Sequence, residues 1–128
     1  MTAIIFPGQG SQYVNMSMDF NENFDVARKV FQEIEDSTQI NIRKIITENP
    51  LDNLNQTNYT QISIFSASMA IYKSLLTEFS NEIINPKILL GHSLGEYSAL
   101  VAGNLINITD ASVLIKKRGE LMHSSIEP

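Results

Sequence analysis

The sequence predicts an α/β fold with parallel strands, on the basis of three observations. Residues 2–6 and 88–90 are short apolar runs, each ended by Pro or Gly, and the segments around them repeat apolar residues at helical spacing. Uninterrupted apolar runs are typical of strands buried on both faces of a parallel sheet. Because two strands are too few for such a sheet, we expect an incomplete fold, with helices on both faces and further strands outside these 128 residues.

The first strand, residues 2–6, is followed by two predicted helices. Apolar residues recur every three or four positions over residues 24–36, with charged residues between them, which indicates an amphipathic helix. Asn41 then precedes a short apolar pattern and is a suitable N-cap. That helix must end before Pro50, because the residue preceding a proline avoids helical angles.

The longest helical pattern covers residues 62–76 and predicts a long helix, for which Asn58 or Thr60 is a candidate cap. The second strand follows at residues 88–90 and ends at Gly91. Its position after a run of helices is that of a strand reached by a helical crossover.

Two helices are predicted after the second strand. The first should run from about 95 to 102, with Gly103 as its C-terminal stop. The second should begin at Thr109 or Asp110 and continue through Met122.

The composition excludes several classes of protein. A chain of 128 residues with 43% hydrophobic and 18% charged residues suits one ordinary domain with a core. A formal net charge of -5 argues against a nucleic-acid partner, whose phosphates need basic side chains. With no cysteine and two histidines, we expect no disulfide, no catalytic thiol and no metal site. We also expect a cytoplasmic protein with no membrane partner, because the sequence has neither a signal peptide nor an apolar run of the ~20 residues that span a membrane.

The segment Gly91-His92-Ser93-Leu94-Gly95 is the most informative motif. It fits the G-x-S-x-G nucleophile elbow and lies directly between a predicted strand and a predicted helix. A serine at such a sharp turn has strained backbone angles, and a glycine two positions away on each side lets the strand and helix approach. The N–H groups at the start of the helix favour negative charge that develops near the hydroxyl. A chance match in a Gly/Ser loop is the alternative.

The loop after the first strand is a candidate partner of this elbow. In open α/β sheets ligands bind at the carboxyl ends of the strands, so Gly8-Gln9-Gly10 should face the same crevice as Ser93. An oxyanion hole needs two N–H donors, and one of them is usually the residue after the nucleophile, here Leu94. The backbone of Gln9 could supply the other, although a Gly-Gln-Gly segment alone is more often an ordinary tight turn.

Taken together, these segments resemble malonyl-CoA:acyl-carrier-protein transacylases, of the acyltransferase family that also includes domains of fatty-acid and polyketide synthases. The matching segments are residues 6–12, Leu54-Asn55, Thr60-Gln61, residues 91–100 and Arg118-Gly119. The resemblance implies an α/β-hydrolase-like large subdomain, of which residues 1–128 would be the N-terminal part, without the small ferredoxin-like subdomain. It also implies fatty-acid biosynthesis: a serine takes malonyl from malonyl-CoA as an ester and passes it to the phosphopantetheine thiol of acyl carrier protein. The coenzyme A thioester is then a substrate, and no cofactor is needed.

The resemblance also assigns roles to individual residues. Ser93 would be the nucleophile, and the backbone amides of Gln9 and Leu94 would form the oxyanion hole. Arg118 would pair with the free malonyl carboxylate, because a guanidinium can donate two parallel hydrogen bonds to it. Gln61 would line the pocket.

Residues 116–118 form a basic run on an otherwise acidic chain. Without the resemblance, such a run is more often a solvated helix face. Lys116 and Lys117 could also serve the phosphates of coenzyme A or an acidic carrier protein.

The chain departs from the family in its general base. A serine nucleophile needs a base, and His92 and His123 are the only histidines. His92 is adjacent to the nucleophile in a sharp turn, so its side chain should project elsewhere and line the pocket, whereas His123 is more often incidental. The family's catalytic histidine comes much later, and we therefore expect a fragment that carries the nucleophile without its base.

Other functions remain open at this stage. A serine hydrolase could use the same elbow, and Arg118 separates the two classes because a neutral ester needs no cationic partner. A carrier-binding remnant with a vestigial serine is a non-enzymatic alternative. The sequence also leaves open an acyltransferase domain of a polyketide synthase and a preference for acetyl or methylmalonyl units.

Overall fold

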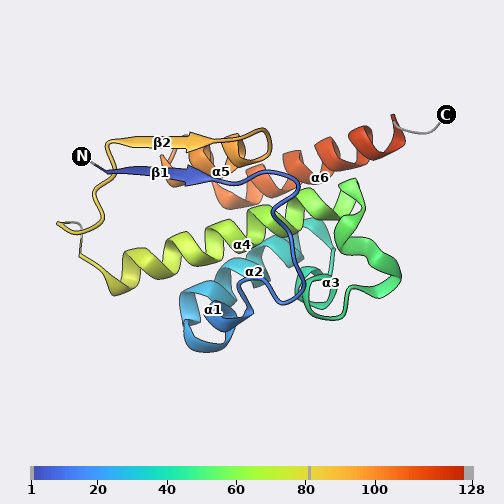
Figure 1. The fold of residues 1–128 in the computed structure, drawn as a ribbon, viewed down its shortest axis with the longest axis horizontal. Helices are drawn as coiled ribbons and strands as arrows, with labels where there is room; N and C mark the ends of the chain where they lie inside the picture. Colours follow the sequence, from blue (N-terminus) through green and yellow to red (C-terminus); the bar gives the residue numbers. More distant parts are fainter. Residues whose placement is uncertain (1, 81, 126–128) are drawn as a thin grey trace.

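Two parallel strands lie along one side of a group of helices that pack around the long helix α4 (Figure 1). This computed structural model describes residues 2–80 and 82–125. The elements in chain order are β1 (Ala3–Phe6), α1 (Met18–Asn23), α2 (Asp25–Thr38), α3 (Ile42–Glu48), the 3₁₀ helix η1 (Pro50–Asn55), α4 (Thr57–Glu78), β2 (Ile88–Gly91), α5 (Gly95–Ala102) and α6 (Ile108–Ser124). The predicted α/β class with parallel strands is confirmed.

The two strands are paired in register over their whole length, with Ala3 opposite Ile88 and Phe6 opposite Gly91. Both strands are present where the apolar runs predict them. Because the strands run in one direction, the loops after Phe6 and Gly91 leave the sheet at the same edge. The backbone N–H of His92 donates to the carbonyl oxygen of Phe6 at 3.2 Å, one residue beyond β2. The sheet thus brings the two glycine-containing loops together.

Helical periodicity predicts three of the helices closely. α2 covers the predicted segment 24–36 to within two residues at each end. α3 has the predicted cap, because the side-chain oxygen of Asn41 accepts a hydrogen bond from the N–H of Lys44, and the helix ends before Pro50. α5 ends at Ala102, and Gly103 follows it as the predicted stop.

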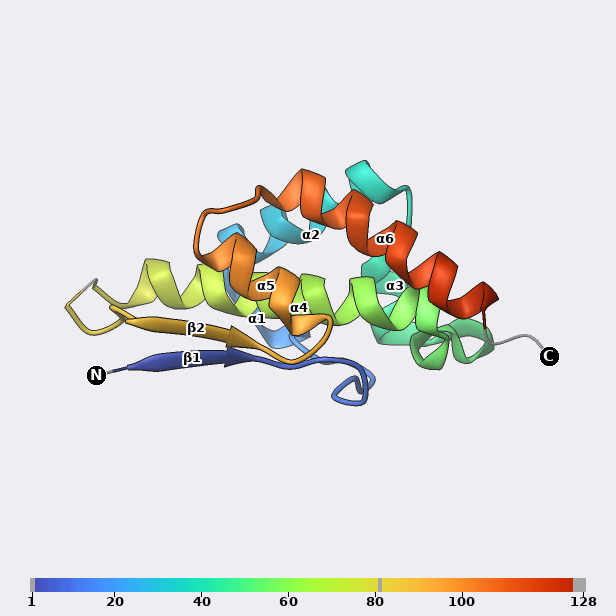
Figure 2. The same ribbon diagram turned by 90° about the horizontal axis from the view of Figure 1, so that it is seen from above.

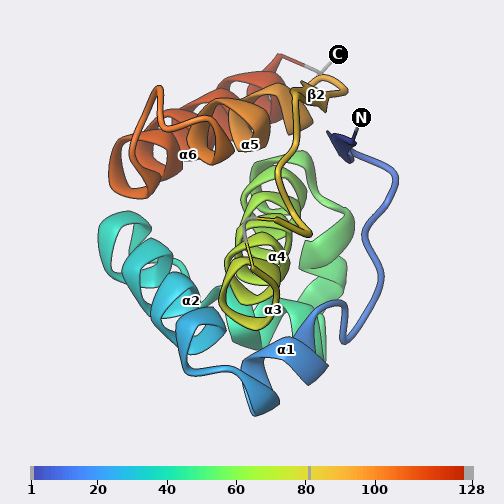
Figure 3. The same cartoon turned by 90° about the vertical axis from the view of Figure 1, so that its left-hand side faces the viewer.

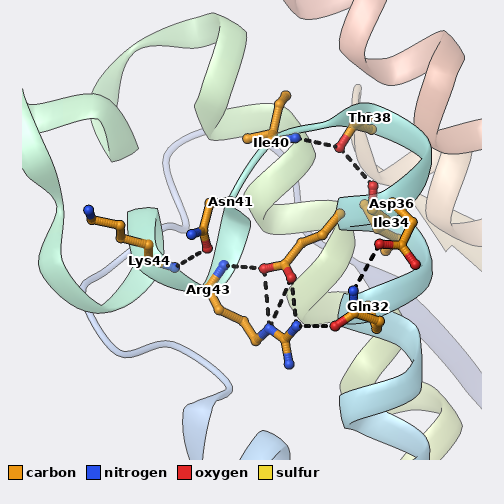
Figure 4. A network of polar contacts seen from close by, with 9 residues as sticks. Gln32, Ile34, Asp36, Thr38, Ile40, Asn41, Arg43 and Lys44 are labelled. Atoms are coloured by element: carbon orange, nitrogen blue, oxygen red, sulfur yellow. Dashed lines mark hydrogen bonds and ion pairs between the residues drawn. The ribbon is translucent and has the colours of Figure 1, made fainter.

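A polar network joins α2 to the start of α3 (Figure 4). The carboxylate of Glu35 accepts hydrogen bonds from the backbone N–H of Arg43 at 2.9 Å and from its Nη2 at 2.6 Å. Nη2 of Arg43 also donates to Oε1 of Gln32 at 2.8 Å. The hydrogen bond to Glu35 raises the pKa of Arg43 above its ordinary value, and burial opposes this with a smaller effect.

The predicted cap of α4 is wrong, and α6 has a cap that the sequence did not predict. The residue before α4 is Gln56, which makes no side-chain cap, and Asn58 and Thr60 lie inside the helix. The buried hydroxyl of Thr60 donates instead to the carbonyl oxygen of Gln56 at 2.9 Å. α6 begins earlier than predicted, because the side chain of Asn107 caps it by accepting from the N–H of Asp110 at 2.8 Å.

Periodicity does not predict the short helices α1 and η1. Each has six residues, so an apolar spacing of three or four cannot repeat often enough to stand out. In η1, Leu51 and Asp52 have φ of 54° and 56°, so this segment is two turns joined by a kink.

Helix α4 forms the centre of the core. Figure 3 shows it with α2, α5 and α6 around it, and α3 also packs against it. Residues 60–70 are all buried, so the predicted one-sided stripe corresponds to a helix enclosed on nearly every side. The hydroxyls of Ser66 and Ser74 donate to carbonyl oxygens one turn back, each at 2.7 Å, which satisfies polar groups that the core encloses. Within the described part of the chain, no helix is both long and apolar enough to cross a membrane.

In the described residues, helices cover only one face of the sheet, which corrects the prediction of strands buried on both faces. α4 and α5 lie on the same side of β1 and β2 in two perpendicular views (Figures 2 and 3). Alternate strand residues point away from these helices, and Ile5, Ile88 and Leu90 are 70%, 45% and 49% exposed. The apolar composition of the strands predicted a second cover that residues 2–80 and 82–125 do not supply.

Candidate active site

Ser93 lies in the tight turn between β2 and α5. Its φ of 54° is in the left-handed region, the strained conformation that the elbow motif predicts. The turn is closed by a hydrogen bond from the N–H of Gly95 to the carbonyl oxygen of His92 at 3.0 Å. A β-carbon at Gly91 would collide with the backbone of Gly95, and one at Gly95 would collide with the carbonyl of Phe6. Both motif glycines are therefore required for close approach of backbone segments.

The loop after β1 is held beside the start of α4. The side-chain amide of Gln9 donates to the hydroxyl of Thr57 at 3.2 Å, and that of Gln12 donates to Asn55 at 3.1 Å. The N–H of Gly10 in turn donates to Oε1 of Gln12 at 2.8 Å. These contacts fix the backbone of the loop near the edge of the sheet where Ser93 lies.

The two amides predicted to form an oxyanion hole have no hydrogen-bond partner among the described residues. Among residues 2–80 and 82–125, no hydrogen bond to another residue uses the backbone N–H of Gln9 or of Leu94. The side chain of Leu94 is 1% exposed, so it is anchored in the core while its N–H lies at the turn before α5. Their joint action on an oxyanion stays a prediction.

Arg118, on α6, reaches Ser93. Its Nη2 donates to Oγ of Ser93 at 3.1 Å, and its Nη1 donates to Oε1 of Gln61 at 2.6 Å. The guanidinium carbon also lies 5.7 Å from the centroid of the Tyr97 ring, within the range of a cation–π contact. The structure thus brings together three residues that the sequence singled out, from α4, the elbow and α6.

Gln61 is 1% exposed and connects Arg118 to a residue that sequence reasoning missed. Its Nε2 donates to Sδ of Met122 at 3.2 Å. Met122 lies four residues after Arg118 on α6, so helical spacing places both on one face and could have indicated it. Tyr97, which sequence reasoning also missed as a site residue, lies four residues after Ser93.

The comparison with known proteins agrees with this geometry. The family described as "Acyl transferase domain" matches residues 3–128. The chain belongs to this family. The malonyl CoA-acyl carrier protein transacylase of Haemophilus influenzae is 36% identical over 124 residues, which are 97% of this chain and 39% of that protein. The predicted relationship to the acyltransferases is confirmed.

Solved structures of similar proteins share the fold of this acyl transferase chain. The acyl-carrier-protein S-malonyltransferase of Bartonella henselae has a TM-score of 0.90 and 37% identity, covering 99% of this chain and 41% of that one. A type II PKS acyl-carrier protein in complex with its malonyl-transacylase gives a TM-score of 0.89 and 35% identity, covering 98% of this chain and 40% of that one. The chain therefore spans about two fifths of the length of these relatives.

The histidines and lysines that the sequence singled out make no hydrogen bond to the side chain of Ser93 among the described residues. His92 and His123 are exposed, and within the described ranges no hydrogen bond joins either imidazole to Ser93. Lys116 donates to the carbonyl oxygen of Thr38 at the end of α2 at 2.9 Å, which is a structural contact, whereas Lys117 is exposed. In the same ranges, no group of three or more His, Asp or Glu side chains is arranged to hold a metal ion.

Proposed function

We propose that this chain is the nucleophile-bearing part of a malonyl-CoA:acyl-carrier-protein transacylase. The observation that carries the proposal is the hydrogen bond from Arg118 to Oγ of Ser93 at 3.1 Å. A guanidinium at this position can pair with an acyl group that has its own carboxylate. A serine hydrolase acting on a neutral ester would not need that charge beside its nucleophile, so the arginine favours the transferase.

The reaction follows from the chemistry of a thioester and a serine. Oγ of Ser93 attacks the thioester carbonyl, the C–O bond of the ester forms, and the C–S bond breaks as coenzyme A leaves with the proton that serine gave up to a base. The amides of Gln9 and Leu94 would donate to the oxyanion, where one donor is worth roughly 100- to 1000-fold in rate. The phosphopantetheine thiol of acyl carrier protein then attacks the ester by the same steps in reverse and carries the malonyl group away.

We infer that the base and further strands come from chain outside residues 1–128. Three observations support this: the relatives are about two and a half times as long, neither imidazole described here makes a hydrogen bond to Ser93, and one face of the sheet is open. On this proposal residues 1–128 are the N-terminal part of an α/β-hydrolase-like large subdomain. The small ferredoxin-like subdomain and the catalytic histidine would then follow Pro128.

A second candidate differs only in the acceptor. The 35% identical structure of a malonyl-transacylase with a type II PKS acyl-carrier protein supports a carrier from polyketide rather than fatty-acid synthesis. The residues that bind malonyl would be the same in both cases. Transfer rates to purified carriers of each kind, compared with one malonyl donor, would separate the two.

Ser93→Ala tests the proposed nucleophile in the full-length protein. With malonyl-CoA, the unmodified protein should gain the mass of one malonyl group, and the variant should gain none because the ester needs Oγ. Intact-mass spectrometry followed by peptide mapping measures this, with Ser98→Ala, a serine on the helix α5 that follows the turn, as the control. A stoichiometric adduct on the Ser93→Ala protein would refute the assignment, and rapid hydrolysis without transfer to a carrier thiol would favour the hydrolase.

A further inference from the structure

We infer that Met122 is a positioning residue for Arg118, acting through Gln61. The sulfur of Met122 holds the buried amide of Gln61 in the orientation that presents an oxygen to the guanidinium. The guanidinium is thereby kept beside Ser93 and ready for an acyl carboxylate. This inference rests on the proposed function, because it concerns selection of a charged acyl group at that site.

The contacts form one continuous line across α6, α4 and the elbow. Sδ of Met122 lies 3.2 Å from Nε2 of Gln61, and Oε1 of Gln61 lies 2.6 Å from Nη1 of Arg118. Nη2 of Arg118 then lies 3.1 Å from Oγ of Ser93. Met122 and Arg118 are one helical turn apart, so α6 presents both of these side chains to the same glutamine on α4.

The chemistry of Arg118 and Met122 determines the orientation of the Gln61 amide that lies between them. A guanidinium has only donors, and a thioether sulfur has only acceptor capacity. An amide has an oxygen at one end and an NH₂ group at the other, so only one of its two orientations satisfies both neighbours. In the flipped orientation, Nε2 of Gln61 would face Arg118, donor against donor, and its oxygen would face a sulfur that cannot donate.

The burial of Gln61 means that water cannot replace a lost hydrogen-bond partner of its amide. Its side chain is 1% exposed, so an amide that loses the sulfur cannot turn to solvent for a replacement acceptor. Met122 is itself 38% exposed, so a change there removes little packing from the core. The sulfur thus has a polar role at a position where its apolar contribution is modest.

Met122→Leu removes the acceptor while keeping an apolar side chain of similar size. The amide of Gln61 is then free to flip, and Arg118 loses its fixed partner. We expect kcat/KM for malonyl-CoA to fall about 5- to 150-fold relative to kcat/KM for acetyl-CoA, the range of one unsatisfied buried donor. Acetyl-CoA has no free carboxylate to pair with Arg118. Its kcat/KM therefore depends on the elbow and the oxyanion hole alone and serves as the reference.

The test compares four full-length proteins: the unmodified enzyme, Met122→Leu, Met122→Gln and Met69→Leu. Single-turnover acylation of Ser93 by each thioester is followed by intact-mass spectrometry. Met122→Gln offers an oxygen acceptor at similar reach and should recover most of the malonyl preference. Met69→Leu, a buried methionine of α4 with no hydrogen bond among the described residues, should leave the preference unchanged.

The outcomes separate this inference from the proposed function. An unchanged malonyl-to-acetyl ratio in Met122→Leu, or equal losses for both thioesters, overturns the positioning role while the transferase stands. The positioning role is also overturned if the malonyl-to-acetyl ratio of Met122→Gln is as low as that of Met122→Leu. An unmodified protein that shows no malonyl preference at Ser93 overturns both the inference and the proposed function.

Discussion

Arg118 is held by a carbonyl oxygen, a hydroxyl and an aromatic ring, so its position beside Ser93 does not depend on one contact. Its predicted role, to pair with the carboxylate of an acyl group, depends on which of these partners a substrate would replace. An acyl carboxylate can compete for Nη2, the atom that donates to the neutral hydroxyl of Ser93, because hydrogen bonds between two charged groups are stronger. The contact to Gln61 remains and keeps the guanidinium in place.

Arg118→Ala should lower kcat/KM for malonyl transfer by about 10- to 150-fold, since hydrogen bonds to charged groups contribute about 1.5 to 3 kcal/mol. Acetyl transfer should fall less, because acetyl has no carboxylate to lose. Steady-state kinetics with both thioesters measures the difference, and Lys117→Ala, an exposed neighbour on α6, is the matched control. Equal losses for both acyl groups would mean that Arg118 has a structural role or contacts coenzyme A.

The site residues that the sequence proposes come from patterns of two kinds. Ser93 and Leu94 are proposed because a short motif fixes both the turn and the residues in it, and Gln9 because its loop follows the paired strand. Gln61 and Arg118 are proposed through the family resemblance, and the structure places Arg118 in contact with both Gln61 and Ser93. Met122 and Tyr97 were missed because a methionine or a tyrosine at helical spacing ordinarily indicates core packing.

The connection between helices α2 and α3 is held by one carboxylate, that of Glu35. Glu35 accepts from the backbone N–H and the guanidinium of Arg43, and its side chain is only 13% exposed. It therefore fixes the direction in which the chain enters α3, next to the cap that Asn41 provides. Periodicity predicted both helices. It could not predict this contact, because residues 35 and 43 lie on different helices and meet only when α2 and α3 pack at a particular angle.

Glu35→Gln should destabilise the folded protein by about 1 to 3 kcal/mol, because the amide loses the charge that these donors face. Thermal unfolding of the variant and of Glu48→Gln, an exposed carboxylate on α3, measures the difference. The pKa of Arg43 is raised in the folded state, so its contribution is complete below the unfolded pKa and is lost only as pH rises through the folded pKa. The loss should therefore be constant across neutral pH, and a loss that disappears between about pH 6 and 9 would contradict this account.

The caps and short helices show where local patterns stop being sufficient. Asn41 was a correct cap because it directly precedes an apolar pattern that begins at Ile42. Asn107 was missed because apolar residues stand on both sides of it, and the choice between neighbouring start points depends on which side chain reaches an unpaired N–H. η1 was missed because its direction is set by the contacts of Asn49 and Leu54 rather than by spacing.

In the molecule as a whole, the two-stranded sheet has the least cover, because helices pack on only one of its faces in the described residues. Ile5, Ile88 and Leu90 expose an apolar face, and an apolar groove of about 170 Å³ runs between β1 and α4. Strands with open edges readily pair with another chain. The fold class could be predicted from the sequence because the alternation of strand and helix is local, whereas the open face of the sheet could not, because apolar strands ordinarily indicate cover on both faces.

The chain of residues 1–128, purified alone, should therefore be inactive and prone to self-association. Inactivity follows from the missing base: losing the histidine of a serine–histidine pair costs on the order of 10⁶ in rate, and neither described imidazole makes a hydrogen bond to Ser93. Self-association follows from the open sheet, which a second copy could cover. Malonylation of a carrier protein by this chain, free of host transacylase, measures the first point, and light scattering after size-exclusion chromatography measures the second. A soluble monomer would show that the sheet needs no cover, and turnover within about tenfold of the Haemophilus influenzae relative would identify His92 or His123 as a working base.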